Sequence, residues 1–96
     1  MIATFRKRRY RISFEYIKQK LSAYGWCDPP DWKNKRIRIE KTLKGQHRLE
    51  ILIHEALHAS HWDICEEAIA ETAVDISRML YRLGYRDLSE LNQESK

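Results

Sequence analysis

The chain has 96 residues, of which 43% are hydrophobic and 33% are charged, and its formal net charge is +4. This length suits a single domain over residues 1–96 with a small core, and the composition excludes a disordered chain. No apolar run is long enough to cross a bilayer or to act as a signal peptide, so we expect a cytoplasmic protein. The two cysteines, Cys27 and Cys65, lack C-x-x-C spacing, so neither a disulfide framework nor a cysteine zinc site is indicated. Residues 88–96 are polar, and we expect them to fray.

Alternating apolar and polar residues predict a half-buried strand over about residues 8–15. Residues 16–24 predict a short helix or an irregular connection. Residues 25–32 combine Gly, Asp and two prolines, which indicates a loop. Residues 36–40 alternate again, so we expect a second strand that pairs with the first as an exposed, charged edge.

The C-terminal half predicts two helices joined by a short turn. The first covers about residues 46–61, and the second covers about residues 64–83. Asp63 and Glu66 have the spacing of a capping box at the start of the second helix, and Gly84 is a natural C-terminal stop. The chain therefore predicts an α+β fold, in which a small antiparallel sheet of two to three strands packs on a C-terminal helical hairpin.

Charge is unevenly distributed along the chain. Residues 1–48 carry 14 Lys/Arg and 4 Asp/Glu, whereas residues 49–96 carry 4 and 10, so the halves have net charges of +10 and −6. The basic run over residues 6–11 favours contact with nucleic acid or an acidic protein, with Tyr10 available to stack on a base. The plainer interpretation is that these cations are solvated on exposed strands and balance the acidic helices.

The segment His54-Glu55-Ala56-Leu57-His58 matches the pattern H-E-x-x-H on the first of the two helices. Two histidines four residues apart on a helix face the same way and can bind one metal ion, and Glu55 can take a proton from a metal-bound water. The helix also has a stripe of mostly apolar or small residues: Leu49, Leu52, Ile53, Ala56 and Ser60. The plainer interpretation is a pair of surface histidines on an amphipathic helix.

Zinc held by two histidines needs a third protein ligand, and a catalytic site leaves the fourth position for water. In an antiparallel helical hairpin, Glu67 and Glu71 stand level with the motif, whereas we expect Glu66 to be engaged by its own helix cap. Two registers are open: Glu67 on zinc with Glu71 behind it, or Glu71 on zinc with Asp75 behind it. The plainer interpretation is that these acids form a solvated helix face.

Residues 54–58 and 67–71 together resemble the zinc-binding segments of thermolysin-like gluzincins, in which H-E-x-x-H is followed by E-x-x-x-D. By this resemblance Glu67 is the third zinc ligand and Glu71 orients a histidine ligand. The gap between the two segments is much shorter than in thermolysin, and in this the chain is similar to minimal zincins and to small phage or bacterial proteins of the ImmA type. The resemblance implies a zinc metallopeptidase that acts on a peptide or protein, with Glu55 as general base toward a zinc-activated water.

In this interpretation strand 36–40 holds an extended substrate beside the cleft, and Tyr81 or Tyr85 is a candidate for stabilising the oxyanion. The alternative is a regulatory or nucleic-acid-binding module in which zinc has only a structural role. The two interpretations differ over Glu55, because a structural zinc site tolerates its loss.

Overall fold

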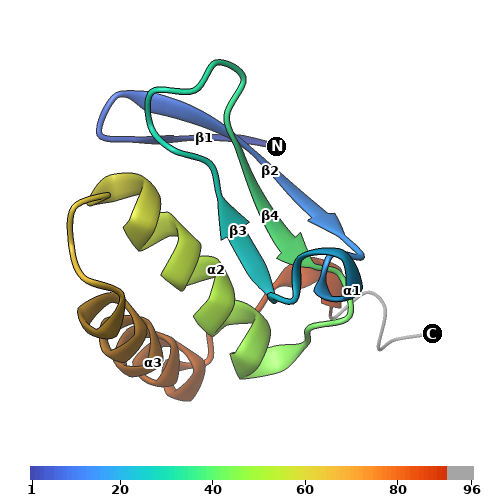
Figure 1. The fold of residues 1–96 in the computed structure, drawn as a ribbon. Coiled ribbons are helices and arrows are strands. Elements are labelled where there is room, and N and C mark those ends of the chain that lie inside the picture. The colour runs from blue at the N-terminus through green and yellow to red at the C-terminus, as the bar shows by residue number, and fades with distance from the viewer. Residues whose placement is uncertain (91–96) are drawn as a thin grey trace.

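The structure, a computed structural model, describes residues 1–90 and has an α+β architecture, as predicted. In chain order the elements are β1 (Ile2–Phe5), β2 (Arg8–Glu15), α1 (Lys18–Leu21), β3 (Gly25–Cys27), β4 (Arg36–Glu40), α2 (Gly45–Ser60) and α3 (Glu66–Leu83). The strands form one sheet, α2 packs on one of its faces, and α3 packs on α2 (Figure 1).

The sheet has four strands in the order β1-β2-β4-β3 and is mixed. The outer pairs are antiparallel, but β2 and β4 run parallel, with Ile12 opposite Ile37 and Phe14 opposite Ile39. The predicted antiparallel sheet of two to three strands is therefore wrong in strand number and in the direction of the central pair. A parallel pair needs a long crossover connection, and residues 16–35, which contain α1 and β3, provide it.

Residues 25–32, predicted to be a loop, contain strand β3. Backbone hydrogen bonds to β4 flank this strand, from Glu40 N to Tyr24 O at 2.7 Å and from Asp28 N to Arg36 O at 3.0 Å. β3 is an edge strand, whereas β4, predicted to be an exposed edge, lies between β2 and β3. Pairing with β4 outweighs the weak local preference of this Gly- and Pro-containing segment.

The core lies between the sheet and α2. The buried side chains that form much of it are Tyr10, Ile12, Ile37, Ile39 and Ala59. Tyr10 is fully buried and donates its hydroxyl to the carbonyl of Asp28 at 3.2 Å. Its ring cannot stack on a base, so that prediction is wrong.

Helix α3 begins at Glu66, two residues later than predicted. Its N-cap is Cys65, which makes no side-chain capping bond, so the predicted cap at Asp63 is wrong. The linker between the helices accordingly spans residues 61–65. Helix α3 ends as predicted at Gly84, whose φ of 102° lies in the left-handed region that glycine adopts readily.

The predicted frayed tail, residues 88–96, lies partly outside the described residues, which end at residue 90. Within the described part, Glu90 accepts a hydrogen bond from the backbone N of Gly45 at 2.9 Å and lies 3.4 Å from Nε of Arg48. This contact ties the end of the described chain to the start of α2. Among residues 1–90, no helix has both the length and the apolar character needed to cross a membrane.

Candidate metal centre

The H-E-x-x-H residues lie in the C-terminal half of α2. At 3.6 residues per turn, His54 and His58 emerge from the same side of the helix, and their ring centroids are 5.0 Å apart. Both imidazoles are partly buried, with exposed side-chain fractions of 16% and 18%. Helix α2 therefore presents two imidazoles that can bind the same ion or side chain.

Glu66, the first residue of α3, brings its carboxylate to both histidines. One carboxylate oxygen lies 2.7 Å from Nε2 of His54, and the other lies 2.7 Å from Nε2 of His58. Each of the three side chains offers one ligand atom, and these atoms all lie within 4.8 Å of one another. Two elements that are separate in sequence thus converge on one point.

The donor set fits a zinc ion. Two imidazole nitrogens and one carboxylate oxygen are the protein ligands of the His₂Glu class of catalytic zinc sites. Tetrahedral bonds of about 2.0–2.2 Å place ligand atoms about 3.3 Å apart, so metal binding requires the present 2.7 Å contacts to widen by about half an ångström. The Glu66 side chain is 67% exposed and has room for that movement.

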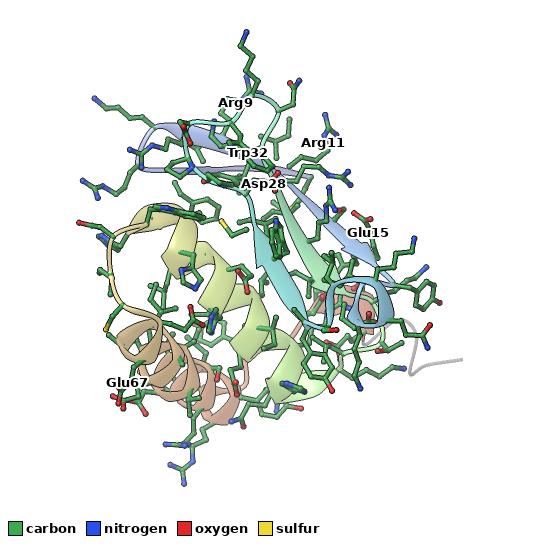
Figure 2. All side chains as sticks on the ribbon, viewed as in Figure 1. Arg9, Arg11, Glu15, Asp28, Trp32 and Glu67 are labelled. Atoms are coloured by element: carbon green, nitrogen blue, oxygen red, sulfur yellow. The ribbon has the colours of Figure 1, made fainter. Side chains whose placement is uncertain are left out.

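Glu67, Glu71 and Asp75 are not brought to the histidines. Glu67 is exposed and lies on the outer side of α3, away from α2 (Figure 2). Glu71 and Asp75 are also exposed and line a shallow hollow on α3 itself. The geometry therefore favours Glu66 over the two registers that the sequence suggested.

The sequence contains a signal for Glu66, although neither predicted register includes this residue. The buried face of α3 is marked by Ile69, Ala73 and Ser77, and Glu66 continues this stripe one turn earlier. Glu67 is rotated by about 100° from that stripe. The capping box suggested by the sequence would have engaged Glu66 at its own helix terminus, but helix α3 has no side-chain cap.

Glu55 is buried, with an exposed fraction of 7%, and faces β3. Burial raises its pKa to about 7, and the nearby Glu66 carboxylate adds to the increase. Gly25 makes this placement possible, because a Cβ there would stand 2.6 Å from Oε2 of Glu55 and 2.8 Å from Cγ2 of Ile51. The lack of a side chain at Gly25 lets strand and helix approach closely at the motif.

A cleft of about 740 Å³ lies beside the histidines, with β3 and the following loop on one side and α2 and the start of α3 on the other. Three partly exposed tryptophans line it: Trp26 is 42% exposed, Trp32 is 53% exposed and Trp62 is 43% exposed. The ring centroids of Trp62 and His58 are 6.3 Å apart. The motif thus opens to a cleft with an aromatic rim.

The tyrosines predicted to stabilise an oxyanion lie elsewhere. Gly45 begins α2, at the opposite end of the helix from His58. The hydroxyl of Tyr81 lies 3.3 Å from the point that a Cβ atom at Gly45 would occupy. Tyr81 and Tyr85 line a separate cavity beside the start of α2. Their proposed role in the motif cleft is therefore wrong, because α3 runs antiparallel to α2 and carries its C-terminal residues away from the motif.

Comparison with protein-family models, with curated proteins and with solved structures finds no match for this chain. The resemblance to gluzincins therefore rests on the H-E-x-x-H motif and on the chemistry of the residues around it.

Proposed function

We propose that this protein is a zinc-dependent metallopeptidase in which His54, His58 and Glu66 hold the metal and Glu55 is the general base. The observation that supports this most strongly is the convergence of the Glu66 carboxylate on both imidazoles, next to a buried Glu55. When bound, zinc would supply Lewis-acid polarisation of the scissile carbonyl and of the attacking water. A cytoplasmic location stays a prediction.

The location of Glu55 supports its proposed role in proton transfer. Its carboxylate lies between α2 and β3, in the wall of the cleft that also contains the histidines. From there it can accept the proton of a water in the cleft and return it to the leaving amine.

Strand β3, rather than the predicted strand 36–40, is suited to hold an extended peptide. Tyr24 and Asp28 direct backbone groups toward β4, and Trp26 is paired with Arg38 in the same ladder. Because the direction of backbone groups alternates along a strand, those of Gly25 and Cys27 point to the open edge. A peptide added there as a further strand would pass the motif.

The decisive experiment compares Glu55→Gln with Glu50→Gln, which makes the same change elsewhere on α2. We expect Glu55→Gln to keep its zinc and to lose hydrolysis, because an amide does not accept the proton of water at neutral pH. Cleavage of an unfolded protein, followed by mass spectrometry, and zinc content per chain are the two measurements. Full activity of Glu55→Gln would show that the peptidase mechanism is wrong.

The regulatory alternative has a separate signature. If the wild-type protein binds zinc through the same three side chains but cleaves no unfolded protein, and Glu55→Gln changes nothing, the site is structural. That result would favour a regulatory or nucleic-acid-binding module.

A further inference from the structure

The sheet face turned away from α2 is rich in arginine. Arg9 and Arg11 of β2 alternate with the buried residues of that strand, and Arg36 and Arg38 of β4 do the same. Figure 2 shows Arg9 and Arg11 pointing away from the helices. Trp26 of β3 pairs with Arg38 in the ladder and so belongs to the same face. We call these five residues the arginine face.

Positive charge on the arginine face is only partly compensated. Arg36 forms a salt bridge with Glu15 at 2.6 Å, whereas Arg9, Arg11 and Arg38 form none with any residue in the described range 1–90. The Nε atoms of Arg36 and Arg38 are buried and have no acceptor within that range. Those two atoms are closed to solvent, so it is the exposed guanidinium groups of Arg9 and Arg11, without an ion pair in that range, that favour a partner with several anionic oxygens.

A hollow beside this face collects further cations. It has a volume of about 500 Å³ and is lined in part by Arg9, Arg11, Lys35 and Arg36. No acidic residue is among the side chains that line it in the described structure. An anionic group in the hollow would therefore meet positive charge from two strands and the loop that connects them.

Trp26 provides an aromatic platform at the other side of the arginine face. Its side chain is 42% exposed, and its Nε1 donates to Oδ1 of Asp28 at 3.0 Å. Asp28 is itself buried, and its Oδ2 accepts from the backbone N of Arg36 at 2.8 Å. The indole N–H is thus bonded to a buried carboxylate, and the side chain stays partly exposed.

We propose that the arginine face binds single-stranded nucleic acid, with phosphates at the arginines and a base stacked on Trp26. Guanidinium groups bind phosphate through paired hydrogen bonds, and aromatic rings stack on bases of any sequence. An acidic peptide would satisfy the charge but would not use the indole in this way. The four arginines lie on the face of the sheet opposite α2, whereas Trp26, on the edge strand β3, also lines the motif cleft.

The test is fluorescence anisotropy of a labelled oligothymidine of about 20 nucleotides, titrated with full-length protein at several salt concentrations. We expect Arg9→Gln/Arg11→Gln to weaken binding about tenfold or more and to reduce the salt slope by roughly 1.4, the value for two lost phosphate contacts. Arg78→Gln/Arg82→Gln, which removes the same charge from exposed positions on α3, should change the Kd less than about twofold.

Three further variants separate stacking from charge and from the metal site. Trp26→Ala should weaken binding roughly fivefold or more, and Trp26→Phe should recover most of the loss. His54→Ala/His58→Ala should bind the oligonucleotide as the wild type does, whatever the outcome for zinc and hydrolysis.

Three results would overturn the proposal. The first is no binding at low ionic strength, and the second is an equal loss in the sheet-face and α3 double variants. The third is that polyglutamate competes with the oligonucleotide at equal charge concentration while Trp26→Ala has no effect. That third result would identify an acidic protein segment as the partner.

Discussion

Glu66 places a carboxylate oxygen 2.7 Å from Nε2 of His58, across the interface between α3 and α2. Glu66→Gln should therefore lower zinc affinity more than about 100-fold, beyond the effect expected for a residue that only supports a ligand. Glu67→Gln is the matched control, because it removes the same charge from the next residue of the helix. Titration of both variants with zinc is the measurement. A Glu67→Gln variant that cannot be saturated would restore the gluzincin register.

Zinc should stabilise the folded chain. The site joins α2 to α3, so it exists only when both helices are packed, and a ligand of the folded state at about 100 times its Kd contributes about 2.7 kcal/mol. For a domain of this size, removal of zinc by EDTA should lower the Tm by roughly 10–20 °C. His54→Ala should melt at the same temperature with and without EDTA. Identical wild-type curves in the two conditions would contradict a metal site here.

Gly25→Ala should destabilise the fold by about 1–3 kcal/mol, because the added methyl group overpacks the contact between β3 and α2. It should also reduce hydrolysis, since the nearest atom is Oε2 of Glu55, 2.6 Å away. Urea unfolding and peptide cleavage measure the two effects.

A double-mutant cycle identifies the cause of the Gly25→Ala effect. In a Glu55→Ala background, Gly25→Ala should cost about 1 kcal/mol less, with the remaining cost due to Ile51 Cγ2 at 2.8 Å. Strict additivity of the two substitutions would show that Glu55 is not the group displaced.

Stability should depend on pH through Glu40. Backbone N–H groups of Lys18 and Thr42, with the Thr42 hydroxyl and the Ile17 N–H, lower the pKa of this carboxyl from 4.5 to about 2. A carboxylate with a lowered pKa stabilises the folded state fully above its unfolded pKa, and this contribution is lost as the pH falls from about 4.5 to 2.

The measurement is the free energy of unfolding against pH for wild type and Glu40→Gln. The wild type should be more stable at neutral pH, and the difference should shrink through that acidic window. Thr42→Val removes only the hydroxyl donor, so it should lower the free energy of unfolding at neutral pH by less than Glu40→Gln does. A difference that does not change between neutral pH and pH 2 would contradict the role of the charge.

Local patterns in the chain were sufficient to predict much of its secondary structure. The alternation over residues 8–15 and 36–40 corresponds to β2 and β4, and the motif helix differs from its prediction by one residue at each end. Gly84 ends α3 as expected. These features follow from side-chain periodicity and from the conformational freedom of glycine, both of which depend on neighbouring residues alone. The geometry of the histidine pair is also a local feature, because it follows from a spacing of four residues on one helix.

Tertiary structure decided which groups meet the histidines. The parallel pairing of β2 with β4 leaves β3 at the edge, and no local pattern in residues 25–32 indicates that position. The length of the linker over residues 61–65 sets the position of α3 along α2. The burial of Ile69 and Ala73 against α2 sets the rotation of α3 about its own axis. A shift of one residue turns a helical side chain by about 100°, so Glu66 faces the imidazoles and Glu67 faces away. Composition and spacing identify the acidic candidates, but only the packing of one helix on the other selects among them.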